Sequence, residues 1–314
     1  FASIETNIGG QTAEIKEGDK IDFSKFGEDD YVAYNVVAQD PNYTKRYILK
    51  VAVLPVAQDH YTFTEWSDDS PVGWANSNGA ASLIPLMGAY LWPKDADGKD
   101  KAMPITRGTA DPSVVVVASR MTTGKNLGAL GFIPAVTAGT LFLGEFSINL
   151  SNTLKSTKFG IPFVEEAFPK SLEVEWSYQA GAKYYATNGA KDANGKFQPV
   201  ENDDDNKTLM VLKPDAPADE GSVAAVIYEV SDYTNDYLDG TNLQTATNIA
   251  AVAYLKKTTN TTMTTESVNF QTAKPFDASK KYKLAIVFSS SAKGDNFEGG
   301  EDSELSVKSV KLNY

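Results

Sequence analysis

Four carboxylates have the chemistry of a catalytic acid and base. The candidate pairs are Glu145 with Asp295, and Glu65 with Asp69. Hydrolysis of a glycosidic bond needs only two such groups, about 5 to 5.5 Å apart when configuration is retained and about 6.5 to 9.5 Å apart when it is inverted. Because the chain has 41 acidic residues, some pair will meet such a spacing by chance. The pattern permits a glycoside hydrolase but does not by itself indicate one.

A second set of residues has the types that bind sugars. Sugars present apolar C–H faces between hydroxyls, so their binding needs flat aromatic rings together with polar side chains. Trp66 and Trp74 lie close together among small polar residues, which is an unusual setting for buried tryptophans. The polar candidates are Asn76, Asn78, Arg120 and, again, Asp295. The alternative is that both tryptophans cap a hydrophobic core, and the sequence leaves that alternative open.

Composition excludes several classes of site and partner. His60 is the only histidine, whereas a serine–histidine–aspartate triad and the common zinc and iron motifs need a histidine beside particular partners. We expect His60 to lie at the surface. The chain has no cysteine, which excludes disulfides and thiolate nucleophiles or ligands. The net charge of −12 would repel nucleic acid and anionic membranes, so neither is expected as a partner.

One acidic segment has some features of a calcium loop. Asp95, Asp97, Gly98 and Asp100 follow one another closely. A full calcium loop would continue to a bidentate glutamate, whereas Asp97-Gly98 is a standard two-residue hairpin turn. We therefore predict a hairpin here and another at residues 192–195. No metal site and no cofactor are predicted, and a structural calcium ion is left as the alternative.

These side chains must be positioned by β-strands, because no sustained helical periodicity occurs in the chain. Short alternating runs and turn signals predict a small immunoglobulin-like β-sandwich as a first domain, residues 1–58. Residues 59–314 are predicted to form a second, larger domain of about a dozen strands. The chain is long enough for both domains to bury a core, although that of the first would be modest.

Three strands of the second domain show which side chains face its core. Successive residues of a strand point to opposite sides, so one face is shared by Leu172, Val174, Trp176 and Tyr178, and in a later strand by Tyr282, Leu284, Ile286 and Phe288. In the final strand, apolar residues alternate at Leu305 and Val307 and again from Val310, but the two sets would point to opposite faces of a regular strand. A β-bulge at Lys308-Ser309 would let both sets face the core. Glu145 shares a face with leucines, so it lies either in solvent at a strand end or half-buried with a raised pKa.

A set of motifs follows in order between about residues 60 and 314: Pro71-x-x-Trp74-x-x-Ser77-Asn78, Ala138-Gly139-Thr140-Leu141-Phe142-Leu143-Gly144-x-Phe146, Phe159-Gly160-Ile161-Pro162-Phe163, Tyr178-x-x-Gly181, and Tyr282-x-Leu284-x-Ile286-Val287-x-Ser289-Ser290-Ser291 into Gly294-Asp295-x-Phe297-x-Gly299. In this set and order, the second domain resembles the putative carbohydrate metabolism domain of surface lipoproteins from gut anaerobes. The segment 34–51 resembles the immunoglobulin-like modules that precede it in such proteins.

The resemblance implies an all-β protein in which a jelly-roll β-sandwich, similar to carbohydrate-binding modules, follows the immunoglobulin-like domain. It also implies a lipid-anchored outer-membrane lipoprotein at the cell surface or in the periplasm, with a signal peptide and lipobox that lie outside this sequence. The final strand of such domains often reads V-D-D-V, where this chain has Val307-Lys308-Ser309-Val310. The missing acidic pair weakens the calcium alternative.

We favour a cell-surface glycan-binding protein that takes part in polysaccharide capture or utilisation, because loop aromatics with a few polar groups suit a binding pocket. Its expected partners are a poly- or oligosaccharide and other surface glycan-uptake proteins, and it is expected to be a monomer. The first alternative is a glycoside hydrolase that uses one of the carboxylate pairs. The second is a structural or adhesin subunit.

Overall fold

The computed structural model describes residues 3–23, 26–27, 29–40, 42–50, 54–82 and 93–314. The chain divides into two compact units, residues 1–55 and 56–314. The predicted boundary between residues 58 and 59 lies close to this division. Each unit is described by itself.

The first unit is a single antiparallel sheet in the order β2-β1-β3-β4. Its strands are β1 Ser3–Ile8, β2 Gln11–Ile15, β3 Tyr31–Val37 and β4 Thr44–Leu49. All six residues of β4 are exposed, so this edge strand has no buried face on which a second sheet could pack. The described part of the unit therefore forms one sheet, and the second sheet of an immunoglobulin-like sandwich is not found there. Residues 51–53 lie outside the described residues.

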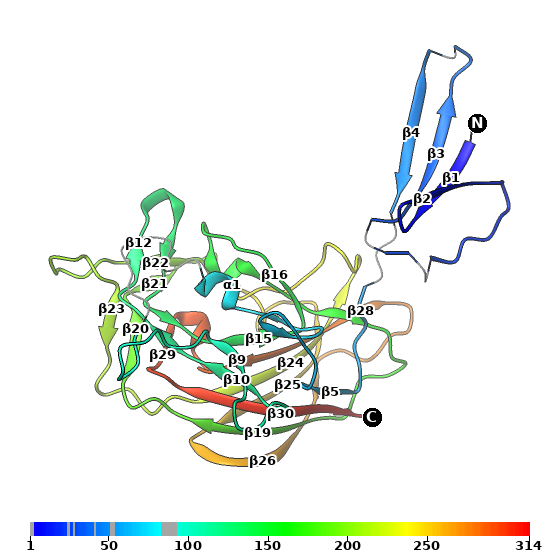
Figure 1. Cartoon of the computed structure of the whole chain (residues 1–314). Helices are drawn as coiled ribbons and strands as arrows, with labels where there is room; N and C mark the ends of the chain where they lie inside the picture. The colour runs from blue at the N-terminus through cyan, green and yellow to red at the C-terminus, as the bar shows by residue number, and fades with distance from the viewer. Residues whose placement is uncertain (1–2, 24–25, 28, 41, 51–53, 83–92) are drawn as a thin grey trace. The chain divides into compact units, whose positions relative to one another are not determined.

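The second unit is built on two antiparallel sheets (Figure 1). The first has the order β26-β19-β30-β10-β9, with β5 also paired to β30, and the second has the order β27-β25-β24-β28-β15-β8, with β18 also paired to β28. The strands of the first are β5 His60–Thr62, β9 Ile105–Arg107, β10 Val115–Ala118, β19 Ser171–Gln179, β26 Asn260–Asn269 and β30 Glu304–Asn313. Those of the second are β8 Ala75–Asn76, β15 Thr140–Phe142, β18 Ile161–Phe163, β24 Gly221–Val230, β25 Ile249–Lys257, β27 Gln271–Thr272 and β28 Lys281–Ser289.

The remaining elements are short and connect or cover these sheets. They are β6 Trp66–Ser67, β7 Ser70–Pro71, α1 Asn78–Ala81, β11 Arg120–Met121, β12 Lys125–Asn126, η3 Gly128–Leu130, β13 Phe132–Ile133, β14 Val136–Thr137, β16 Gly144–Phe146, η4 Thr153–Ser156, β17 Thr157–Phe159, β20 Tyr184–Thr187, β21 Gly189–Lys191, β22 Phe197–Pro199, β23 Met210–Leu212, η5 Gly294–Asn296 and β29 Glu298–Gly300.

The main hydrophobic core lies between the two sheets, which makes the unit a β-sandwich. The predicted alternation of β19 and β28 is confirmed, because all eight of their predicted inward residues are buried: Leu172, Val174, Trp176, Tyr178, Tyr282, Leu284, Ile286 and Phe288. The predicted bulge is also confirmed. Glu175 pairs with Ser309 and Trp176 with Val307, so Lys308 is the extra residue, and the buried residues on both sides of it face the core.

The second sheet also has a covered outer face. Alternate residues of β24 and β28 pack there into a separate hydrophobic cluster with Phe142 and Phe159, from the segment 140–163, and with Leu238. Figure 1 shows α1 and β16 on this side of the sheet, opposite the strands β19, β26 and β30. A sheet with both faces covered reads as a nearly continuous apolar run, as β24 does in GSVAAVIYEV.

Both predicted hairpin turns are confirmed. Lys94 and Asp100 form an antiparallel bridge around Gly98, which has φ +77°. The Asp95 Oδ1 atom accepts hydrogen bonds from the backbone N–H groups of Asp97 and Lys99, so this carboxylate serves the turn. The segment 192–195 joins β21 to β22 in the same way.

Candidate functional site

A cavity of about 490 Å³ opens on the outer face of the second sheet. Its floor is made by two rows of residues that run across neighbouring strands. The pairings Thr140–Ser289 and Ser289–Ser222 make a hydroxyl row, and the pairings Val287–Ala224 and Ala224–Tyr254 make an apolar row. Small side chains in β24 and β28 leave this part of the face open.

The walls come from segments that are far apart in the sequence. They are supplied by residues 132–138, 146–157 and 240–245, and by the loop around η5. Most of the wall side chains are apolar, and their aliphatic members include Ile133, Val136, Ile148, Leu150, Leu154 and Leu243. A largely apolar cavity of about 300 to 1,000 Å³ with a few polar groups is the usual form of a small-molecule site.

Two charged residues line the cavity, and they neutralise each other. Lys191 Nζ lies 2.7 Å from Asp295 Oδ2, and both side chains are partly exposed. Tyr254 stands on the floor, and burial raises the pKa of its hydroxyl, so this phenol is neutral at physiological pH. The cavity therefore offers hydrogen-bonding groups with no net charge.

Two of the lining threonines carry hydroxyls that need a partner. Thr137 Oγ1 and Thr153 Oγ1 are buried and make no hydrogen bond within the described chain. A buried hydroxyl without a partner costs about 1 to 3 kcal/mol. Rotation about χ1 changes the direction of a threonine hydroxyl, so both residues have unused capacity to bind a ligand.

Asp295 is the only candidate carboxylate that lines this cavity. Glu145 is exposed on β16, where its Oε2 lies 3.7 Å from Lys158 Nζ. Gly144 has φ +140° and a Cβ there would lie 2.1 Å from Lys158 O, so the strand turns at this glycine and directs Glu145 into solvent rather than toward the leucines. Of the two settings that the sequence allowed for Glu145, the structure shows the exposed one.

Glu65 and Asp69 are exposed in the loop after β5, and neither lines the cavity. The Asp69 carbonyl accepts a hydrogen bond from Asn76 Nδ2 at 3.1 Å. Neither predicted carboxylate pair therefore lies in the cavity, because Asp295 is the only one of the four candidates that lines it. His60 is exposed on β5, as predicted.

The structure places Trp74 in the main core and not at the cavity, where it could stack on a sugar. This side chain is only 7% exposed and belongs to the main core. Its ring centroid lies 5.4 Å from those of Tyr61 and Phe63 and 5.8 Å from that of Phe288. Trp66 is half-buried against the same core, and its Nε1 donates to Phe63 O at 2.8 Å. Neither tryptophan lines the cavity, so the core-capping alternative is the one observed.

The two candidate asparagines hold the backbone together. Asn78 is buried, its Nδ2 donates to Ile105 O at 2.8 Å, and its Oδ1 accepts from Ile105 N at 2.9 Å. Asn76 Oδ1 accepts from the backbone N–H of Asn78 at 2.8 Å. Both ends of the Asn78 amide are thus bonded to Ile105, and Asn76 has a structural partner on each side of its amide. Neither residue lines the cavity, so ligand contact by either stays a prediction.

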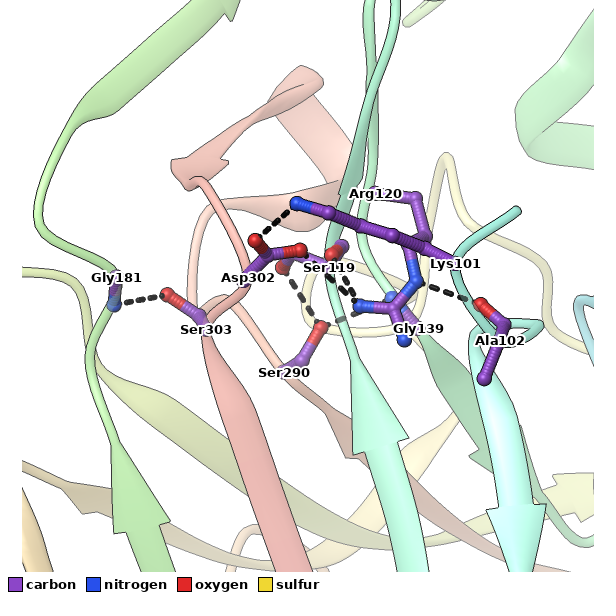
Figure 2. Close-up of polar contacts among 9 residues, drawn as sticks. All are labelled: Lys101, Ala102, Ser119, Arg120, Gly139, Gly181, Ser290, Asp302 and Ser303. Carbon is purple, nitrogen blue, oxygen red and sulfur yellow. Dashed lines mark hydrogen bonds and ion pairs between the residues drawn. The ribbon is translucent and has the colours of Figure 1, made fainter. Parts of the chain in front are cut away.

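Arg120 also has a structural role. Figure 2 shows its guanidinium facing the carbonyl of Ala102 and the carboxylate of Asp302, which Lys101 also contacts. Arg120 Nε donates to Ala102 O at 2.7 Å, and Nη1 to Ser119 O at 3.0 Å and Asp302 Oδ1 at 3.4 Å. Burial lowers the pKa of Arg120. The side chain thus links its own segment to Ala102 and Asp302 inside the protein, and it does not line the cavity.

The sequence analysis missed Asp219, the buried carboxylate behind the η5 loop. Its Oδ1 accepts from Ser291 Oγ at 2.8 Å and Glu220 N at 2.9 Å, and its Oδ2 from Gly300 N at 2.7 Å and Ser303 Oγ at 2.8 Å. Burial raises its pKa, and these hydrogen bonds oppose the rise. No local pattern distinguishes Asp219 from the other acidic residues, because its partners come from distant segments.

The hydrogen bonds around Asp219 explain why residues 299 and 300, between η5 and β30, are glycines. A Cβ at Gly299 would lie 2.8 Å from Ser291 Oγ, and one at Gly300 would lie 2.4 Å from Ser303 Oγ. These glycines are required by the close approach of the serines that bind Asp219. Ser291 also lines the cavity, so these hydrogen bonds support one of its walls.

Within the described ranges, no three or more histidine, aspartate or glutamate side chains gather as a metal ion would require. No helix within those ranges is long and apolar enough to span a membrane.

Comparisons with known proteins place the chain in a family. A search of the curated proteins gave no match. Among solved structures, one described as a putative glycoside hydrolase from Bacteroides thetaiotaomicron VPI-5482 is 22% identical, with a TM-score of 0.55 over 100% of this chain and 84% of that one. Another, described as a putative glycoside hydrolase from Bacteroides vulgatus ATCC 8482, is 19% identical, with a TM-score of 0.54 over 83% of this chain and 99% of that one. At these identities the likeness shows a shared fold.

The family assignment rests on the sequence. The family model described as "putative carbohydrate metabolism domain" matches residues 53–313, which include nearly the whole β-sandwich unit. The predicted resemblance is thereby confirmed, and the chain belongs to the putative carbohydrate metabolism domain family.

Proposed function

We propose that the protein binds a carbohydrate in the cavity on the outer face of the second sheet and does not hydrolyse it. The observation that carries the proposal is that, among the described residues that line the cavity, Asp295 is the only carboxylate. Hydrolysis by the usual mechanism needs two carboxyl groups on either side of the bond that is cleaved. A cavity with a single carboxylate, already paired with Lys191, suits binding.

The family supports carbohydrate as the ligand class. A sugar has an apolar face and a hydroxylated edge, and the floor of the cavity has an apolar row beside a hydroxyl row. Such a floor can bury the face and hydrogen-bond the edge at the same time. A location at the cell surface and other surface glycan-uptake proteins as partners remain predictions.

We expect wild-type protein to be retarded in native gels that contain a bound polysaccharide and to release no reducing sugar from it. Replacing Ala224 on the floor by leucine should fill part of the cavity and displace the ligand, which should weaken retention about tenfold or more, equal to a loss of about 1.4 kcal/mol of binding free energy. The matched control is Ala167→Leu, because Ala167 is exposed and does not line the cavity. Its retention should be unchanged, and melting curves should show that both variants are folded.

The alternative function is a glycoside hydrolase, in agreement with the descriptions of the two similar structures. Release of reducing sugar by the wild-type protein, lost in Glu145→Gln or Asp295→Asn, would establish that alternative. A glycan retained equally by wild type and Ala224→Leu would show that binding occurs elsewhere.

A further inference from the structure

We propose that the cavity selects a neutral sugar that carries a methyl group, either as a 6-deoxy carbon or as part of an acetyl group. This inference rests on the proposed function, because it names the kind of carbohydrate that the same cavity would take. It follows from the charge, the wall chemistry and the floor of the cavity, which are considered in turn.

The charge of the cavity favours a neutral ligand. Of the residues that the structure describes, Lys191 and Asp295 are the only charged ones that line the cavity, and their side chains are 2.7 Å apart. A uronic acid or a sulfated sugar would have to compete with Asp295 for Lys191. It would also approach a chain whose net charge is −12, which repels anions over a distance. A neutral sugar meets neither obstacle.

The aliphatic part of the walls favours a methyl group over a hydroxyl, although polar side chains such as Asn149 and Gln244 also line the cavity. Branched aliphatic side chains project from several segments, among them Ile133 from β13 and Ile148 and Leu150 from the segment 146–157. A sugar hydroxyl placed against such side chains would lose its water without gaining a hydrogen bond, at a cost of about 1 to 3 kcal/mol. A methyl group in the same place gains from burial.

The floor supplies hydrogen bonds to the remaining hydroxyls of a sugar. Thr140, Ser289 and Ser222 lie side by side across three strands, and each hydroxyl can both donate and accept. Thr137 and Thr153 add two hydroxyls that have no partner within the described chain. A ligand that is polar on one edge and methylated elsewhere matches this division, whereas a lipid tail would leave the hydroxyl row unused.

The volume of about 490 Å³ suits a short ligand, since it falls in the lower part of the range of about 300 to 1,000 Å³ that small-molecule sites occupy. The cavity would therefore hold the end of a glycan or a side-chain sugar, and the remainder of a polymer would lie outside. This places the methyl-bearing sugar at a terminus or branch.

The experiment uses pairs of probes that differ in the methyl group. L-Fucose and L-galactose differ only in whether carbon 6 carries hydrogen or hydroxyl, so only L-fucose has a methyl group. N-acetyl-D-glucosamine and D-glucose differ in the acetamido group at carbon 2, and D-glucuronic acid tests charge. Binding is measured by isothermal titration, and saturation-transfer NMR identifies the ligand protons nearest the protein.

We expect at least one methyl-bearing probe to bind about tenfold or more tightly than its partner, with its methyl protons the most strongly saturated. Ile148→Asp, in an exposed part of the wall, should weaken that probe about tenfold or more. The matched control is Val164→Asp, since Val164 is also an exposed aliphatic residue but does not line the cavity. It should leave the affinity unchanged.

The outcomes separate this inference from the proposed function. Suppose that wild-type protein retains the polysaccharide and Ala224→Leu does not. If the two members of each probe pair then bind with equal affinity, or if the hydroxylated or anionic probe binds more tightly, the inference is overturned and carbohydrate binding stands. If no polysaccharide is retained and no probe binds, both fall. Equal losses in Ile148→Asp and Val164→Asp would also overturn the assignment to this cavity.

Discussion

Replacing Trp74 by alanine is expected to lower the free energy of unfolding by about 3 to 5 kcal/mol, the usual cost of truncating a buried aromatic residue. The indole is 7% exposed and packs against Tyr61, Phe63 and Phe288. Phe288 comes from the second sheet and Tyr61 from the first, so the substitution leaves a cavity between the two sheets. Thermal unfolding followed by circular dichroism should show a fall in Tm of roughly 10 °C.

The control for Trp74 is an aromatic residue at the surface. Tyr237 is 40% exposed, and Tyr237→Ala should change the free energy of unfolding by less than about 1 kcal/mol. A Trp74→Ala protein with an unchanged Tm and no glycan retention would contradict the buried position and restore Trp74 as a ligand contact.

Asp219→Ala is the second substitution with a large expected effect. Removing the carboxylate leaves the backbone N–H groups of Gly300 and Glu220 and the hydroxyls of Ser291 and Ser303 without their acceptor. Since an unsatisfied buried donor costs about 1 to 3 kcal/mol and serine hydroxyls can turn elsewhere, we expect a total loss of about 3 kcal/mol or more. Chemical denaturation, with the slope compared to wild type, measures it.

Asp219→Asn should be less damaging, and its effect should depend on pH. The amide keeps one oxygen but turns an NH₂ group toward two of the four donors. Burial raises the pKa of Asp219 in the folded protein, so folding favours its protonated form. Its contribution to stability is then fully present below the pKa of an unfolded aspartate, about 3.9, and is lost as the pH rises through the raised value. The difference in Tm between wild type and Asp219→Asn should therefore narrow as the pH rises across that window.

A matched acidic control is Asp302, in the turn between β29 and β30. Asp302 is partly exposed and contacts Lys101 and Arg120, so Asp302→Asn should cost less than Asp219→Ala. Equal losses for the two substitutions would mean that burial of Asp219 is not what makes its hydrogen bonds important. A difference in Tm that widens with rising pH would contradict the direction of the pKa shift.

The strands and their faces could be predicted because the signal is local. The alternation of apolar and polar residues in β19 depends only on the sequence of that strand. In β30, the shift in the same alternation directly indicates the bulge at Lys308. The family motifs are likewise recognised from the sequence, by their order along the chain. These features need no knowledge of which segments meet in space.

The site could be predicted only in part, because its members are brought together by pairing between distant strands. Trp74 has polar neighbours in sequence but aromatic neighbours in space, and Asn78 finds its partner at Ile105. The cavity depends on small residues in β24 and β28 meeting walls from other segments. Asp219 stands beside Glu220 in one of several acidic segments, and nothing in its local sequence indicates that it is buried.

The position of β30 has a consequence for synthesis of the protein. This strand pairs with β19 along one edge and with β10 and β5 along the other. A ribosome makes β5, β10 and β19 long before β30, so the first sheet lacks its middle strand until residues 304–313 have emerged. We expect the sandwich to assemble in one late step, and unfinished chains to expose the edges of β10 and β19 to other polypeptides.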